Sequence, residues 1–338
     1  MLRLFPKLGL LDFPERYGLK RARLPYPTGI LAIATFLVCF SLITTWNMQA
    51  VGLIAGSILL LGTACIDDRM PLPAWLRLGI QVLTALIIFA TGSRIYTMTN
   101  PLEGFFGLGS LIKLDTMDLL VPFFGPLPIW SGIFTVLWLG LTINALNWFD
   151  GIPGQVSALS TIGFLTIGFL SLSARVNQPE LAGIAFVLTG ISLACILFDF
   201  PPPRVIMGDS GSMFFGLMLG VLTLYSGGKV ATAFLVLGVP LIDSVIVVVR
   251  RLLRGQSIFH GSAGGEHLHH RLLERGWAPQ KIILLTVLLG GSFGITALFL
   301  STKGKFLAAL ILALIMLVLS ISSGKTSADK TAARNGCS

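Results

Sequence analysis

Long apolar runs separated by short polar segments dominate the chain, and this pattern predicts helices that cross a membrane. A helix needs roughly 20 predominantly apolar residues to span the hydrocarbon core. Ten such segments are expected: 28–45, 49–66, 75–95, 129–147, 155–173, 180–198, 211–226, 230–250, 280–300 and 305–323. The predicted fold class is an all-α polytopic membrane protein with about ten transmembrane helices.

The polar segments divide the chain into an arm, one membrane domain and a tail. Residues 1–27 form a basic arm interrupted by prolines, and 28–323 form the integral domain. Inside that domain, 96–128 is predicted to be an external loop with a short hairpin at Leu111–Asp115, and 251–279 a cytoplasmic loop rich in His and Arg. The tail, 324–338, is rich in Lys, Ala and Ser and is predicted to be disordered.

Composition excludes an ordinary soluble globule. The chain is 54% hydrophobic and 12% charged, whereas a soluble domain carries about 25% charged residues. The net charge of +9 would suit a nucleic-acid partner, but basic residues in a membrane protein report topology first. Aromatic or base-reading partners for the basic residues are missing, so no nucleic acid is expected. The four cysteines form no metal or disulfide pattern.

Charge asymmetry predicts the orientation of the helices. With the N-terminus inside, 18 of the 24 Lys and Arg residues fall in inside segments and six in outside segments. Cytoplasmic loops carry the excess of positive charge, so both termini are expected in the cytoplasm.

Four polar clusters then fall on the cytoplasmic face. They are Asp67-Asp68-Arg69, Asn144–Gly154, Met207–Ser212, and the segment 250–280 with His260 and Glu266–His270. Separated pieces of chain that converge on one face are typical of a functional site rather than of scattered loop polarity.

Asp67 and Asp68 suit a divalent cation. They follow a helix that runs inward, so they lie at its partially negative end and repel each other. Mg²⁺ would remove both penalties, because it prefers hard oxygen ligands. The alternative is a pair of loop carboxylates neutralised by Arg69 and Arg77.

Asn144, Asn147 and Asp150 are spaced to lie along one row of a helix, which Gly151, Pro153 and Gly154 then end. This row is either a binding site or an ordinary wetted helix end. Further along, Asp209 or Ser210 is a good N-cap for the next apolar helix. Small residues such as Gly211 and Ser212 also leave helix N–H groups open to a phosphate.

The histidine loop indicates an anion site more than a zinc site. His267, His269 and His270 have no neighbouring cysteine and lack the His-Glu-x-x-His spacing. The arginines around them, including Arg271, favour phosphate, although docking to anionic lipid headgroups explains the same charges. Asp243 lies inside the span 230–250, about 10 Å deep at 1.5 Å per residue. Such a carboxylate is either functional or paired with a neighbouring helix.

Together these groups describe phosphoryl transfer at a membrane surface. Asp67-Asp68-Arg69, Asn144-x-x-Asn147-x-x-Asp150-Gly151, Gly208-Asp209-x-Gly211-Ser212 and His267-x-His269-His270 resemble the polyprenyl-phosphate N-acetylhexosamine-1-phosphate transferases. The resemblance runs from about Leu11 to the last span. It implies an enzyme of the bacterial cytoplasmic (inner) membrane that moves a sugar 1-phosphate from a UDP-sugar to undecaprenyl or another polyprenyl phosphate. UMP is released, and cell-envelope glycan synthesis, such as that of lipopolysaccharide, begins.

The resemblance also implies roles for individual residues. Asp209 would be the main ligand of Mg²⁺, with Mn²⁺ as an alternative, and Asp67 and Asp68 would assist the metal and the attacking phosphate. Asp150 and His267 would complete the catalytic set. The substrate-binding residues would be Asn144, Asn147, Gly151, Ser212, His269, His270 and Arg271. A homodimer is an open expectation.

Two features depart from the family pattern. Its Asp-Asp-x-x-Asp motif has Pro71 in the last position here, so a third carboxylate cannot hold metal. The family's first spanning helix has no counterpart before residue 28, and the histidine typical of the following loop is absent from Lys20–Pro25.

The donor is expected to be UDP-N-acetylglucosamine. Leu268 interrupts the histidines and Arg271 follows them, which resembles the branch that transfers N-acetylglucosamine 1-phosphate. Trp277, in contrast, resembles the pattern of the branch that uses the muramoyl-pentapeptide. A phospho-N-acetylmuramoyl-pentapeptide transferase is therefore the alternative. A transporter is a third possibility, but transport predicts polar residues at the midplane rather than at one face.

Overall fold

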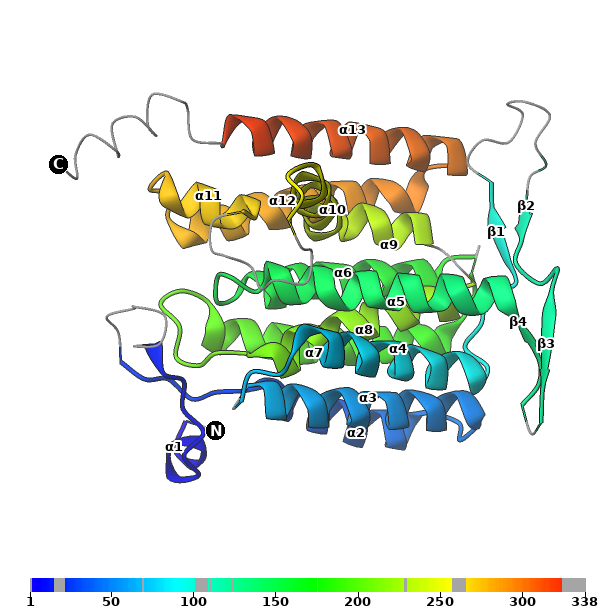
Figure 1. The fold of residues 1–338 in the computed structure, drawn as a ribbon, viewed down its shortest axis with the longest axis horizontal. Coiled ribbons are helices and arrows are strands. Elements are labelled where there is room, and N and C mark those ends of the chain that lie inside the picture. Colours follow the sequence, from blue (N-terminus) through cyan, green and yellow to red (C-terminus); the bar gives the residue numbers. More distant parts are fainter. Residues whose placement is uncertain are drawn as a thin grey trace.

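The computed structural model is a bundle of roughly parallel and antiparallel helices with a small β region at one end (Figure 1). It describes residues 2–14, 22–68, 70–100, 109, 111–122, 124–174, 176–227, 230–256 and 266–323. The tail predicted to be disordered, 324–338, and part of the predicted loop 251–279, including His260, lie outside the described residues.

Each of the ten predicted spans contains a helix. The helices are α1 Leu4–Lys7, α2 Gly29–Ile43, α3 Met48–Asp67, α4 Ala74–Ala90, α5 Ile129–Phe149, α6 Gln155–Leu172, α7 Pro179–Asp199, α8 Asp209–Tyr225, α9 Val230–Val236, α10 Gly238–Leu253, α11 Leu268–Glu274, α12 Pro279–Phe299 and α13 Thr302–Ser322. Of those described, six are long and apolar enough to cross a membrane, or seven if α9 and α10 count as one broken span. The shorter apolar helices are α2, α4 and α8. The chain is thus a multi-pass membrane protein, while the expected number of ten transmembrane helices is not confirmed.

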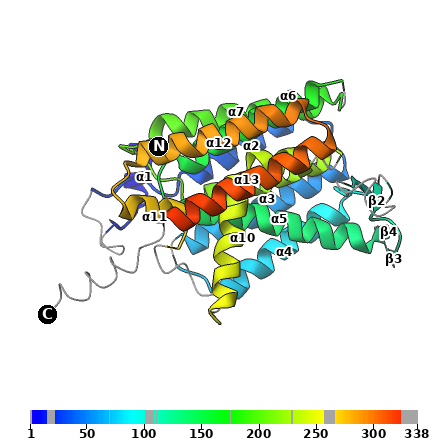
Figure 2. The same cartoon turned by 90° about the horizontal axis from the view of Figure 1, so that it is seen from above.

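The span predicted at 230–250 is not one straight helix. Helices α9 and α10 meet at a bend of 84°, and Figure 2 shows α10 running across the direction of the other helices. The depth estimated for Asp243 assumed a continuous helix along the membrane normal. That estimate is wrong. The rise of 1.5 Å per residue runs along the axis of α10, and this axis lies across the other helices rather than parallel to them.

The β region corrects the expected hairpin. Strand β2 (Leu111–Lys113) pairs antiparallel with β1 (Thr97–Thr99), not with the residues that follow it. A second antiparallel pair joins β3 (Asp118–Val121) to β4 (Gly125–Pro128). We call this end of the bundle the hairpin end. The opposite end, where α3, α5 and α7 finish and α6, α8 and α12 begin, is the site end (Figure 1).

Helix α8 lies at the centre of the core, and every residue from Ser210 to Leu224 is buried. Small residues allow this packing, since a Cβ at Gly216 would lie 2.6 Å from the carbonyl oxygen of Thr142 on α5. Helix α13 is the opposite case. Its buried residues are Ala308, Leu312, Met316 and Ser320, a single stripe with a spacing of four.

Candidate active site

Five carboxylates gather at the site end, and we call them the carboxylate cluster. Asp67 ends α3 and Asp68 follows it, Asp150 follows α5, Asp199 ends α7, and Asp209 begins α8. Four of these residues come from the predicted polar clusters, whereas Asp199 was not predicted. The convergence of the predicted clusters on one end of the bundle is confirmed (Figure 1).

Asp68 caps α8 from a different helix. Its Oδ1 accepts the backbone N–H of Asp209 at 2.9 Å, and its Oδ2 accepts that of Ser210 at 3.4 Å. The expectation that Asp209 or Ser210 caps this helix is wrong, because the N-cap position is Gly208 and has no side-chain bond. The N–H groups expected to be open to a phosphate are therefore engaged by a carboxylate, which satisfies the same electrostatic preference.

A tyrosine completes the surroundings of Asp68. The Tyr26 hydroxyl donates to Asp68 Oδ1 at 2.6 Å. Limited access to water raises the pKa of Asp68, and the hydrogen bonds from Tyr26 and from the start of α8 offset part of this rise. Gly208 makes this arrangement possible: its φ is +79°, and a Cβ there would lie 2.7 Å from Pro27 and 3.2 Å from Asp68 Oδ1.

Arg77 on α4 links Asp67 to Asp209. Its Nη1 lies 3.1 Å from Asp67 Oδ2 and 3.7 Å from Asp209 Oδ2. Asp67 also accepts the backbone N–H of Leu72 at 2.6 Å. Pairing with Arg77 is what the non-metal interpretation of Asp67 predicted; Arg69 lies outside the described residues. The side chain of Asp209 is 35% exposed, whereas that of Asp67 is 5% exposed. Asp209 is therefore the carboxylate of this pair that a ligand can reach.

Asp150 and Asp199 lie in a buried part of the cluster, close to other carboxyl groups. Burial raises the pKa of Asp150 well above its usual range, and the neighbouring carboxylates Asp209, Asp199 and Asp68 raise it further. Asp199 is 2% exposed; Ser157 donates to its Oδ2, while its Oδ1 has no partner among the described residues. Such a set of oxygens favours a bound cation. Among the described residues, however, no three His, Cys, Asp or Glu side chains form a preformed metal site.

The two amides predicted to share a row serve different neighbours. Asn147 donates to Ser212 Oγ at 3.2 Å and so borders the carboxylate cluster. Asn144 instead exchanges hydrogen bonds with Gln81 on α4, the shorter at 2.6 Å. Gly151 follows Asp150 at the start of the predicted break, where α5 ends.

The three predicted histidines form a second group, the histidine cluster. The rings of His267 and His269 are stacked with centroids 5.9 Å apart, and those of His269 and His270 are 4.1 Å apart. His267 pairs with Asp243, whose Oδ2 lies 2.8 Å from Nδ1. Burial and the neighbouring imidazoles of His270 and His267 hold the pKa of His269 well below its usual range.

His269 is a packing residue in this structure. It is 1% exposed, and neither ring nitrogen has a hydrogen-bond partner among the described residues. Phe149 meets its ring edge-on at a centroid distance of 5.8 Å. A Cβ at Gly151 would overlap His269 Nε2, so glycine is required there for space. Arg271 points elsewhere and donates to the backbone oxygen of Ser320 at 2.9 Å.

The end of α5 joins the two clusters. Asn147 contacts Ser212 beside the carboxylates, and the next two residues, Trp148 and Phe149, contact His267 and His269. Three consecutive residues therefore connect the two groups, which are far apart in sequence.

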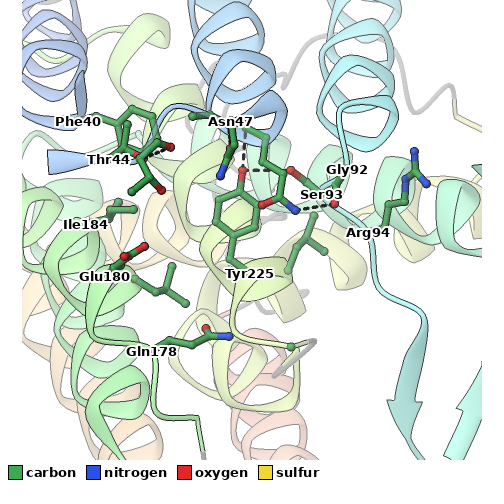
Figure 3. A pocket seen from close by; sticks show the side chains of 16 residues that line it. Phe40, Thr44, Asn47, Gly92, Ser93, Arg94, Gln178, Glu180, Ile184 and Tyr225 are labelled. Carbon is green, nitrogen blue, oxygen red and sulfur yellow. Dashed lines mark hydrogen bonds between the residues drawn. The ribbon is translucent and has the colours of Figure 1, made fainter. Parts of the chain in front are cut away.

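A cavity of about 470 Å³ lies at the hairpin end, remote from both clusters. Tyr225 lies among Asn47, Ser93, Gln178 and Glu180 in this cavity (Figure 3). None of the predicted site residues lines it.

The family is decided by comparison with known proteins. The sequence model that describes glycosyl transferase family 4 matches residues 50–227 of the 338 residues in this chain. The chain belongs to glycosyl transferase family 4. The match contains the whole carboxylate cluster and ends before the histidines. The predicted resemblance and the prediction of a membrane-bound phosphotransferase are thus confirmed.

Named relatives align with a larger part of the chain than the family model does. The probable undecaprenyl-phosphate N-acetylglucosaminyl 1-phosphate transferase of Bacillus subtilis is 28% identical over 94% of this chain and 85% of its own length. The decaprenyl-phosphate N-acetylglucosaminephosphotransferase of Mycobacterium leprae is 30% identical over 72% of this chain and 62% of its own. The undecaprenyl-phosphate alpha-N-acetylglucosaminyl 1-phosphate transferase of Escherichia coli K12 is 27% identical over 86% of this chain and 77% of its own.

Three polar partners in the site were not predicted from the sequence, namely Gln81, Asp199 and Tyr26. Gln81 lies one helical turn after the predicted partner Arg77 on α4, so a second polar residue on the same face of an apolar helix was a usable signal. Asp199, at the end of an apolar run, was another. Tyr26 had no comparable signal, because its role depends on the contact between residues 25–29 and 206–207.

Proposed function

We propose that this enzyme transfers N-acetylglucosamine 1-phosphate from UDP-N-acetylglucosamine to undecaprenyl phosphate. A phosphate oxygen of the lipid attacks the sugar-linked phosphorus, the bond from that phosphorus to the bridging oxygen breaks, and UMP leaves with the electron pair. The observation that carries the proposal is the gathering of five carboxyl groups at one end of a membrane bundle, with Asp209 accessible among them. The names of three relatives support the same reaction class.

The chain's own residues suit positioning and charge balance. Asp209 is accessible and would hold Mg²⁺ together with neighbouring carboxylates; when bound, the ion would neutralise these carboxylates and withdraw charge from the reacting phosphates. Arg77 keeps Asp67 and Asp209 close together. The histidine cluster adjoins this site through α5 and would receive the diphosphate or the sugar.

The test offers purified full-length protein undecaprenyl phosphate, Mg²⁺ and a panel of UDP-sugars, and measures UMP together with the lipid product. We expect UMP with UDP-N-acetylglucosamine, and none after chelation of the metal. UMP with UDP-N-acetylmuramoyl-pentapeptide alone would overturn the donor assignment and leave the reaction class intact. No lipid-linked product with any donor would overturn the proposed reaction.

We further propose that the site end faces the cytoplasm, on the basis of the 18-to-6 charge split. Cysteines replace Thr99 at the hairpin end and Ala278 at the site end, in a background lacking the four native cysteines. An impermeant maleimide added to intact cells should label Thr99→Cys, and Ala278→Cys only after lysis. The reverse pattern would overturn the orientation.

A further inference from the structure

Asp243 is a buried carboxylate that the proposed reaction does not use. It lies in the first half of α10, just beyond the 84° bend that separates this helix from α9. Its exposed fraction is 2%, and its neighbours Leu241 and Ile242 are buried apolar residues. Burying an ionised carboxylate is costly unless hydrogen bonds compensate.

Both oxygens of Asp243 bind the start of the histidine segment. Oδ2 lies 2.8 Å from His267 Nδ1, and Oδ1 accepts the backbone N–H of Leu268 at 3.0 Å. The carboxylate thus holds the His267 ring and also the first residue of α11. Because a carboxylate only accepts hydrogen bonds, Nδ1 is the ring nitrogen that must carry a proton.

The rest of the surroundings fix the plane of the ring. His267 stacks on His269 at an interplanar angle of 10°, and the Trp148 ring lies 6.2 Å from it on the α5 side. Only 3% of His267 is exposed. The hydrogen bond of His267 to Asp243 uses Nδ1, and the ring geometry points Nε2 away from Asp243.

We propose that Asp243 is a positioning residue that fixes the Nδ1–H form of His267 and presents Nε2 to the diphosphate of the sugar nucleotide. When the diphosphate binds, Nε2 takes up a proton from solvent and donates it in a hydrogen bond to a phosphate oxygen, while the carboxylate of Asp243 balances the charge of the ring. The bend before α10 is what brings an acidic residue of this helix to the histidine. This inference rests on the proposed function for the identity of the ligand at Nε2.

A spectroscopic test is independent of activity. The chain has four histidines, so selective ¹⁵N-histidine labelling gives few signals, and a His267→Gln sample assigns the one of interest. We expect Nδ1 of His267 to be protonated in the native enzyme. In Asp243→Asn, whose single carbonyl oxygen cannot serve both Nδ1–H and the Leu268 N–H, this form should lose population. A native His267 protonated only at Nε2 would overturn the proposal.

The kinetic test separates positioning from a general structural role. Asp243→Asn should lower kcat by roughly tenfold to a hundredfold, as for other residues that orient a functional histidine. In the His267→Gln background the same change should have no further effect on kcat. Independent, multiplicative losses would overturn the proposal. Ser244→Ala, a buried neighbour on α10, is the matched control and should retain native turnover.

The assay uses whichever UDP-sugar releases UMP in the donor panel. A failure of the donor assignment therefore leaves this test intact. Absence of any transfer would overturn the proposed function, while the tautomer measurement would still decide the role of Asp243.

Discussion

The carboxylate cluster and the histidine cluster share one end of the bundle but balance charge in opposite ways. In the first, Asp68, Asp199 and Asp209 lie close enough to Asp150 to raise its pKa, and Arg77 is shared between Asp67 and Asp209. In the second, Asp243 is matched to His267, and the neighbouring His269 is neutral at pH 7 because its pKa is lowered. The first cluster is suited to a cation, whereas the second is already organised without one.

The prediction with the largest expected effect concerns the charge of the carboxylate cluster. Asp209→Asn keeps the size of the side chain and removes a charge that would hold Mg²⁺. We expect turnover to fall at least a hundredfold, on the order of 3 kcal/mol of transition-state stabilisation. Because Asp209 does not cap α8 through its side chain, thermal unfolding should change little.

Asp118→Asn, in β3 at the hairpin end, is the matched control and should keep native turnover. Near-native turnover in Asp209→Asn would show that the cluster works without this charge.

The second prediction tests the tight packing of the histidine cluster. Gly151→Ala places a methyl group onto His269, and the ring must move among Phe149, His267 and His270. We expect a loss of stability of about 1–3 kcal/mol, as for other overpacked sites, measured by thermal unfolding in detergent.

A second change should relieve this clash. Gly151→Ala combined with His269→Ala should be more stable than the additive expectation, because the atom that clashes is gone. Gly190→Ala is the control: a Cβ at this position in α7 meets no atom, so stability should rise by roughly 0.5–1 kcal/mol. Equal effects of the two alanines would contradict the packing argument.

The third prediction concerns the hydrogen bond between Tyr26 and Asp68. Tyr26→Phe removes a donor that lowers the pKa of Asp68, so this pKa should rise further. If the ionised carboxylate is the active form, the acidic limb of the profile of kcat/KM against pH moves to higher pH. Stability should fall by about 1 kcal/mol.

Tyr96→Phe, an exposed tyrosine near β1, should leave the profile unchanged. An unshifted acidic limb in Tyr26→Phe would mean that Asp68 does not set it.

The smallest expected effect is at Pro71. This exposed residue stands where the family pattern has a third aspartate. Pro71→Asp should change turnover less than twofold, because the described cluster assembles without a carboxylate there. A clear gain in turnover or in apparent Mg²⁺ affinity would show that the family position is functional and merely lost here.

The hydrophobic pattern was sufficient to predict a helix in each of the ten spans, and the charge asymmetry predicted that the polar clusters share one face. Segment lengths and helix-ending residues such as Gly151 and Gly154 are local properties, so the sequence alone reveals them. The bend between α9 and α10 was missed although the sequence holds a signal for it. Pro240 has no N–H to bond the carbonyl oxygen of Val236, which is the last residue of α9.

The residues that form the site were easier to predict than the hydrogen-bond partner of each one. Asn144 and Asn147 have the same side chain and the expected helical spacing, yet they bind Gln81 and Ser212 on different helices. Asp68 was expected at a metal, and the structure places it across the start of α8. Which neighbours a side chain meets depends on helix rotation and contact, and one sequence does not specify these.

The central position of α8 has a consequence for how this chain tolerates change. A helix that touches lipid on one side can vary along that side, and α13, with one buried stripe, has such freedom over most of its surface. Helix α8 has none between Ser210 and Leu224. In a deep mutational scan, α13 should therefore show intolerance at every fourth position, whereas α8 should form an unbroken block in which even conservative enlargements are rejected.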